Sequence, residues 1–205
     1  MPLGASVTYG VGSSTGSSYR RDLRDLLVSA ANQTVDMVGT RKHGDFADND
    51  VEATSGFAIS QIAEAAATAV PRLLPNLVLV DAGTNNCNGG GTVPDAGANV
   101  TAMIEEMFLQ SPGVTVVLAT ILGNAVAAQD ACRVDINAQY VALVARLRAA
   151  GGKVLLVDLR GSEGPITNDL VDGRHPNDVG YRKMAGVWFE GIQQAISQGL
   201  VTTAC

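Results

Sequence analysis

Residues 77–87 read LVLVDAGTNNC, and this stretch decides the fold. Four apolar residues without polar alternation are typical of a parallel strand that is covered on both faces. The glycine, threonine and asparagine that follow end the strand in a loop. Similar strand-like runs lie at Val35–Val38, Val114–Leu122 and Val154–Leu159. We therefore predict a sheet built from these runs and from a short first strand that ends near Ser6.

Helical patterns separate the predicted strands. Apolar residues recur at helical spacing in five stretches, which are Tyr19–Ala31, Ile59–Leu74, Val100–Leu109, Ile136–Ala150 and Val179–Ser197. Alternation of strands and helices predicts a parallel sheet with helices on both faces. We expect residues 1–205 to form one α/β domain. Its architecture is a flavodoxin-like, three-layer α/β/α sandwich with a central parallel sheet of about five strands.

The residues directly after each strand matter most, because ligands of open α/β sheets bind outside the carboxyl ends of the strands. Ser6 lies in the first such loop, within LGASVTYG at residues 3–10. A serine beside glycine can expose its hydroxyl group, but loops of this kind are common and have no function by themselves. A phosphate-binding loop at Gly10–Gly16 lacks support, because neither phosphate-binding glycine pattern is present.

Two further loops offer hydrogen-bond donors. Gly56 follows the second strand region, where a glycine can bring its backbone N–H close to a ligand. Asn85 follows the strand at residues 77–80, and its side-chain amide can donate to a developing oxyanion. Each residue also has a purely structural interpretation, since glycine and asparagine are frequent in turns.

The segment VDGRHPN at residues 171–177 is the most informative. His175 is one of only two histidines, and it has Asp172 three residues before it and Pro176 directly after it. In a compact turn, Asp172 accepts a hydrogen bond from Nδ1 of His175 and leaves Nε2 free to face a serine. A base with an orienting carboxylate activates serine nucleophiles. The alternative is an ordinary surface turn, and the second histidine, His43, lies in a polar segment that we expect to be exposed.

The four segments in this order resemble the SGNH (GDSL-like) hydrolase family over essentially the whole chain. The resemblance implies that Ser6 is the nucleophile, His175 the general base and Asp172 the residue that orients the histidine. It also implies an oxyanion hole formed by the backbone N–H groups of Ser6 and Gly56 and the side chain of Asn85.

Within this family, the opening MPLGxSxTxG, the acidic stretch before Gly56 and the Gly-Thr-Asn followed by Cys87 look like carbohydrate esterase family 3. Its members are known as acetylxylan esterases. The resemblance implies removal of O-acetyl groups from xylan or a related plant cell-wall polysaccharide through an acyl-enzyme on Ser6, with no metal or organic cofactor. Ala5 departs from the aspartate of the family pattern, and residues 53–54 are Ala-Thr where relatives often carry Gly-His.

Charge and hydropathy argue against a nucleic-acid-binding protein and against a membrane protein. The formal net charge is −6, so neither nucleic acid nor an anionic membrane surface is an expected partner, whereas a neutral carbohydrate is compatible. No apolar run approaches the ~18 residues of a membrane span. The basic pairs Arg20–Arg21 and Arg41–Lys42 are expected at solvated ends of elements, and we expect a monomer.

Four acidic residues lie close together in the sequence, at Asp45, Asp48, Asp50 and Glu52. A calcium site is one interpretation, but the spacing does not match an EF-hand loop. We therefore expect a solvated acidic loop near the substrate cleft.

The cysteines suggest an oxidising compartment. Cys87 and Cys132 each follow an apolar strand-like run, which predicts a disulfide between them, with two buried free thiols as the alternative. Cys205 is expected to be free or paired outside the chain. Sequons begin at Asn32 and Asn99. We expect a secreted protein, with upstream residues removed because the chain has no signal peptide and its first strand is very short.

Two other functions remain open. A lipolytic esterase, thioesterase or lysophospholipase on the same scaffold would need an apolar groove for a long acyl chain. A non-catalytic carbohydrate-binding protein would need aromatic stacking surfaces, and the chain has only one tryptophan, Trp188, which we expect in the core.

Overall fold

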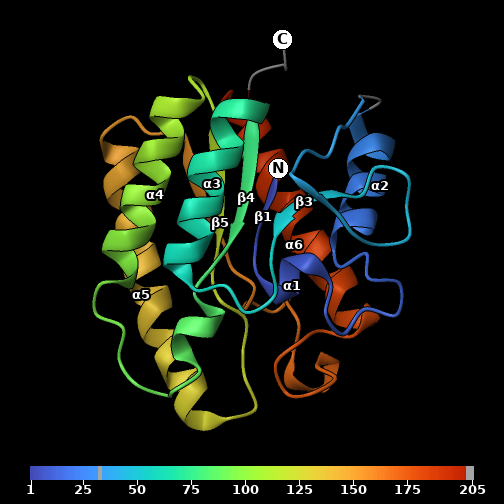
Figure 1. The fold of residues 1–205 in the computed structure, drawn as a ribbon, viewed down its shortest axis with the longest axis vertical. Helices are drawn as coiled ribbons and strands as arrows, with labels where there is room; N and C mark the ends of the chain where they lie inside the picture. Colours follow the sequence, from blue (N-terminus) through green and yellow to red (C-terminus); the bar gives the residue numbers. More distant parts are fainter. Residues whose placement is uncertain (32–33, 202–205) are drawn as a thin grey trace.

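A six-stranded sheet lies at the centre of the computed structural model, which describes residues 1–31 and 34–201 (Figure 1). The strand order is β2-β3-β1-β4-β5-β6. All neighbouring strands are parallel except β2, which runs antiparallel to β3. The strands are β1 (Pro2–Gly4), β2 (Arg41–Lys42), β3 (Asp50–Ala53), β4 (Leu77–Asp81), β5 (Thr115–Ala119) and β6 (Val154–Val157).

Helices cover both faces of this sheet, as the sequence predicts (Figure 1). The longer helices are α2 (Arg20–Ala31), α3 (Ile59–Leu73), α4 (Ala96–Gln110), α5 (Ala127–Ala149) and α6 (Asp178–Ser197). The short elements are α1 (Ser6–Tyr9) and the 3₁₀ turns η1 (Thr84–Cys87) and η2 (Thr167–Asp169).

Alternate side chains of the central strands enter two separate cores. Val78 and Val80 pack with α3, α4 and α5, whereas Leu79 between them packs with α2 and α6. Trp188 of α6 is fully buried in the second core, as expected, where it contacts Tyr19. Burial on both faces explains why β4 has no polar alternation in its sequence.

The structure corrects the prediction for Val35–Val38, which is not a strand. The backbone N–H of Met37 donates to both carboxylate oxygens of Asp48, at 3.1 Å, instead of to a neighbouring strand. The position beside β1 is taken by β3, whose Glu52 and Ala53 are in register with Leu3 and Gly4. The antiparallel edge strand β2 then raises the sheet from about five predicted strands to six.

Helix α5 also differs from the prediction, since it begins at Ala127 rather than at Ile136. Its first turns are polar, so the apolar periodicity starts late. Two of these polar residues are nevertheless buried, because Arg133 and Asn137 bind backbone groups of residues 121–123 after β5.

Within residues 1–31 and 34–201, no helix combines the length and apolar character that a membrane span requires.

Arg20 is fully buried, which corrects the expectation of a solvated helix end. Its guanidinium donates to five backbone carbonyls, those of Thr8, Tyr9, Gly16, His43 and Asn49, at 2.7–3.3 Å. The side chain therefore ties α1 and the loop after it to the loop at residues 43–49. Burial lowers the pKa of Arg20, opposed by nearby tyrosines.

Replacing Arg20 by methionine is expected to lower the free energy of unfolding by at least about 3 kcal/mol, because buried carbonyls lose a charged donor. Urea unfolding followed by the fluorescence of Trp188 measures the change. Arg21→Met is the matched control, since the Arg21 side chain is 41% exposed. Equal destabilisation by both substitutions would contradict the role given to Arg20.

Candidate active site

Ser6 lies at the first position of α1, directly after the turn that ends β1. The turn is tight, because a Cβ added at Gly4 would lie 2.5 Å from Thr8 Oγ1 and 2.7 Å from the carbonyl oxygen of Asp81. Only glycine at position 4 lets α1 pack this closely against the strand ends. Ser6 therefore begins a short helix rather than lying in an extended loop, and it is 3% exposed.

His175 lies in a loop that Asp172 holds in shape. Asp172 Oδ1 accepts hydrogen bonds from the backbone N–H groups of His175 and Arg174, at 2.8 and 3.0 Å. Its Oδ2 lies 2.7 Å from Nδ1 of the imidazole ring. Burial alone would raise the pKa of Asp172, but these hydrogen bonds outweigh it and lower the pKa to about 2. The carboxylate is therefore ionised at neutral pH and accepts the Nδ1 proton.

The imidazole ring reaches the serine on its other side. Nε2 of His175 lies 2.9 Å from Ser6 Oγ, and the two residues are 169 positions apart in the sequence. With the proton on Nδ1, Nε2 is the acceptor for the serine hydroxyl. This arrangement can transfer the hydroxyl proton to the histidine while the serine oxygen attacks an electrophile.

Asn85 and Gly56 follow the two strands that flank β1. Asn85 Nδ2 donates one proton to the carbonyl of Phe57 at 2.9 Å, and Asn85 Oδ1 accepts from Asn88 Nδ2 at 3.4 Å. These contacts set the orientation of the amide and leave its second N–H available for a ligand. Gly56 has φ +89°, and a Cβ added there would meet no protein atom within 4 Å, so its backbone borders open space.

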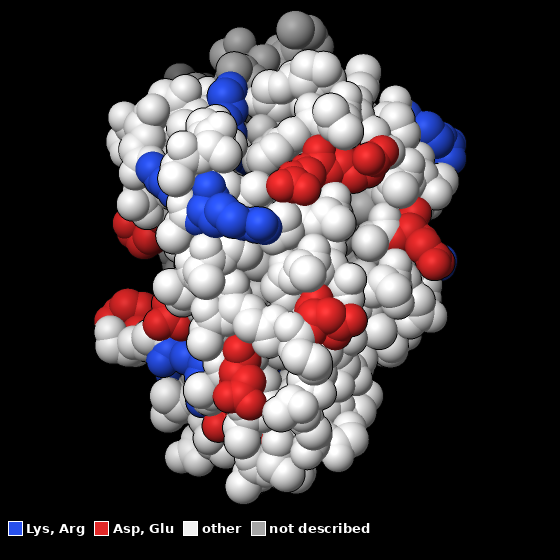
Figure 2. Space-filling view, turned by 90° about the vertical axis from the view of Figure 1, so that its left-hand side faces the viewer, with Lys and Arg blue, Asp and Glu red and all other residues white. Residues whose placement is uncertain are grey.

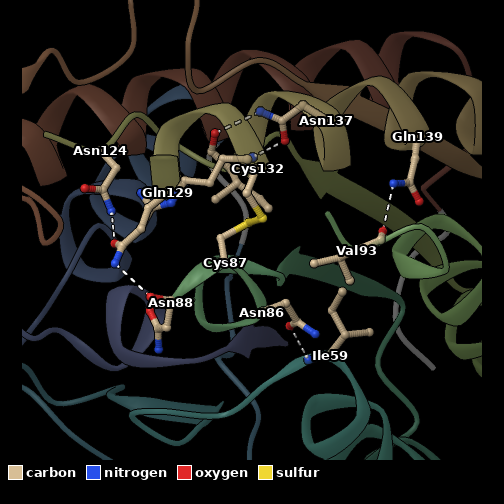
Figure 3. The surroundings of a disulfide bond; sticks show 12 residues. Ile59, Asn86, Cys87, Asn88, Val93, Asn124, Gln129, Cys132, Asn137 and Gln139 are labelled. Carbon is tan, nitrogen blue, oxygen red and sulfur yellow. Dashed lines mark hydrogen bonds between the residues drawn. A yellow bond between two sulfur atoms is a disulfide. The ribbon is translucent and has the colours of Figure 1, made fainter. Parts of the chain in front are cut away.

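A disulfide supports this side of the site (Figure 3). Cys87 at the end of η1 is bonded to Cys132 of α5, with 5.6 Å between their Cα atoms. Asn86 of the same turn accepts a hydrogen bond from the backbone N–H of Ile59, at 3.0 Å. The turn that carries Asn85 is therefore anchored to both α5 and α3. The Cys205 and Asn32 predictions lie outside the described residues.

Three of the four acidic residues before Gly56 bind groups of the protein, which corrects the expectation of a solvated loop for these three, whereas Asp45 is exposed. Asp48 pairs with Arg24 at 2.6 Å, and Glu52 is 5% exposed and accepts from the backbone N–H of Thr40. Asp50 pairs with Lys42. Within the part of the chain that the structure describes, no three histidine, cysteine or acidic side chains gather as metal ligands.

Asp81 is a buried carboxylate that the sequence interpretation did not single out. It ends β4, is 3% exposed, and accepts a hydrogen bond from Thr8 Oγ1 of α1 at 3.3 Å. Burial raises the pKa of Asp81 to about 6, opposed by the Thr8 hydrogen bond and the charge of Arg133. Because the folded protein binds this proton more tightly than the unfolded chain, ionised Asp81 destabilises the fold above pH 6.

Asp81→Asn is therefore expected to stabilise the fold relative to wild type more at pH 8 than at pH 4.5. The difference in free energy of unfolding between variant and wild type should shift by about 2 kcal/mol between these pH values. The destabilisation by the wild-type carboxylate decreases as the pH falls from 6 toward 3.8, which is the ordinary pKa of an aspartate. Urea unfolding at both pH values checks this, and a pH-independent difference would contradict it.

Residues 3–183 match the model of the GDSL-like lipase/acylhydrolase family. The chain belongs to this family. A search of curated proteins finds no match.

Several solved esterase structures are similar to this chain over nearly its whole length. A family 3 carbohydrate esterase of Clostridium thermocellum is 28% identical, with a TM-score of 0.84 over 98% of each chain. A carbohydrate esterase of the same family from Talaromyces cellulolyticus is 26% identical, with a TM-score of 0.82 over 97% of each chain. An acetyl esterase with serine replaced by alanine and an acetate ion is 25% identical, with a TM-score of 0.82 over 97% of this chain and 98% of that one. Together with the family match, these structures support an esterase of the SGNH type.

Proposed function

We propose that this protein is a serine esterase that removes acetyl groups from a carbohydrate such as xylan. The observation that carries the proposal is the continuous contact from Asp172 through His175 to Ser6, with distances of 2.7 and 2.9 Å. The names of the family 3 carbohydrate esterases and of the acetyl esterase supply the acetyl and carbohydrate parts. The Cys87–Cys132 disulfide supports a secreted enzyme.

The proposed reaction has two steps. His175 takes the proton of Ser6 as the serine oxygen attacks the ester carbonyl, and the oxyanion is held by the backbone N–H groups of Ser6 and Gly56 and by Asn85. His175 then gives the proton to the leaving sugar oxygen. In the second step, His175 takes a proton from water, which attacks the acetyl-serine and releases acetate.

The position of the apolar groove in the molecule bears on the length of the acyl group. The apolar groove between α3 and α4, of about 430 Å³, has no triad residue in its lining. A lipolytic esterase would need such a groove at Ser6.

The kcat/KM for p-nitrophenyl acetate is therefore expected to exceed that for the octanoate ester by roughly 100-fold. Release of acetate from acetylated xylan, measured in parallel, tests the carbohydrate part. Faster hydrolysis of the octanoate ester, without acetate release from xylan, would favour the lipolytic alternative instead.

A further inference from the structure

A chain of hydrogen bonds joins the two sides of the site. Arg174 Nη2 donates to Gln129 Oε1 at 3.0 Å, and Gln129 Nε2 donates to the carbonyl of Asn88 at 3.0 Å. Asn88 Nδ2 donates to Asn85 Oδ1 at 3.4 Å. Because Arg174 directly precedes His175, this chain runs from the histidine loop to the oxyanion amide. The Arg174 guanidinium therefore lies beside the site.

Gln129 holds the arginine in place with a neutral group. Its Oε1 also accepts from Asn124 Nδ2 at 2.9 Å, and Figure 3 shows its amide between Asn124 and Asn88. Both ends of the amide are engaged, so its orientation is set. A guanidinium has five N–H donors, and the amide oxygen of Gln129 uses one of those of Arg174.

The guanidinium of Arg174 has no carboxylate partner within 4 Å in residues 1–31 and 34–201. Five other Lys and Arg side chains form ion pairs, among them Arg24–Asp48, Arg160–Asp130 and Lys183–Asp169, whereas the remaining ones form none within the described residues. Arg174 is only half-buried, and therefore its remaining donors can meet a ligand.

A second arginine adds positive charge behind the first. Arg133 is fully buried, and its Nε and Nη2 have no hydrogen-bond partner. Burial, and next the charge of Arg174, lower the pKa of Arg133 to about 10, opposed by Asp81 and Asp130. The net charge of the whole protein is −6, and the face across α4 and α5 mixes acidic and basic side chains (Figure 2). The ionised carboxylate of Asp172 also lies beside His175, but both of its oxygens accept hydrogen bonds within the histidine loop.

The leaving sugar must lie near His175, which protonates its oxygen. The loop at residues 10–16 closes one side of the histidine, because a Cβ added at Gly12 would lie 2.5 Å from the carbonyl oxygen of Pro176 and 3.3 Å from His175 Cβ. We infer that the sugar lies on the side of Arg174 and Gln129.

We propose that Arg174 binds a carboxylate of the substrate, so that the preferred substrate is an acetylated oligosaccharide with a uronic acid next to the acetylated sugar. This inference rests on the proposed esterase function. Guanidinium and carboxylate groups form paired, charge-assisted hydrogen bonds, which explains arginine rather than lysine at this position.

The test compares two fractions of acetylated xylo-oligosaccharides, one neutral and one carrying glucuronic acid, separated by anion exchange. For the wild type, kcat/KM is expected to be roughly tenfold higher on the acidic fraction, and added salt should reduce this preference. Arg174→Gln should bring the ratio of the two values close to one, and Arg174→Lys should give an intermediate ratio. A purely structural role of Arg174 would change both values together and leave their ratio unchanged.

Arg72→Gln is the matched control, because Arg72 lies exposed in the last turn of α3 and should retain the wild-type ratio. Equal wild-type activity on the two fractions, or an unchanged ratio in Arg174→Gln, would overturn the inference and leave the esterase proposal standing. Absence of acetate release from either fraction would overturn both.

Discussion

Ser6→Ala and His175→Ala are each expected to lower kcat for acetate release by at least about 10⁴-fold. In the proposed mechanism, the first removes the oxygen that forms the acyl-enzyme, and the second removes the base that lies 2.9 Å from it. Because the two groups act together in the same step, the double variant should retain nearly the same activity as either single variant. Initial rates on p-nitrophenyl acetate and on acetylated xylan measure the losses.

Asp172→Asn should cost less than either change, because the carboxylate orients the ring and does not react. Two backbone N–H groups of the loop donate to the same oxygen of Asp172, Oδ1, so an asparagine oxygen in that position can retain both hydrogen bonds while its NH₂ group faces the imidazole ring. A larger loss in Asp172→Asn than in Ser6→Ala would contradict these roles, provided that Trp188 fluorescence shows both variants to be folded.

Asn85→Ala is expected to lower kcat by roughly 10²–10³-fold with a smaller change in KM, because in the proposed mechanism its second N–H stabilises an oxyanion that exists only in the transition state. Rates on p-nitrophenyl acetate over a range of concentrations separate the two parameters.

Asn86→Ala is the matched control for Asn85, since it lies in the same 3₁₀ turn. Asn86 bonds the backbone of Ile59, so its loss should weaken the attachment of α3 to η1 with little direct effect on an oxyanion. Equal losses of kcat in both variants would show that the turn as a whole matters, rather than the amide of Asn85.

The sheet could be predicted where strands are buried on both faces. The runs at 114–122 and 154–159 contain β5 and β6, and the run at 77–80 covers all of β4 except Asp81, because continuous apolar sequence is required between two helical layers. The second strand was misplaced, since Val35–Val38 is apolar but bonded to Asp48. The true strand, β3, contains Asp50 and Glu52 and has no such signal. Glu52 can be buried because its carboxylate accepts a hydrogen bond from the backbone N–H of Thr40.

For the site, the sequence predicted which residues lie after which strands, and the structure brings Ser6, His175 and Asp172 within hydrogen-bond distance. The supporting contacts could not be predicted, because they join segments that are far apart in the chain. Arg20 binds carbonyls up to 29 residues away, and Arg174 reaches Gln129 across 45 residues. In the sequence, each of these arginines has an aspartate two positions away, a pattern that is also typical of solvated side chains.

The central claim is that Ser6 is the nucleophile, and covalent labelling tests it most directly. The protein is treated with a fluorophosphonate, which forms a stable bond to an activated serine oxygen, and the labelled peptide is identified by mass spectrometry. We predict one adduct, on Ser6, which is absent in Ser6→Ala and forms much more slowly in His175→Ala. An adduct on another residue, together with wild-type acetate release by Ser6→Ala, would contradict the account.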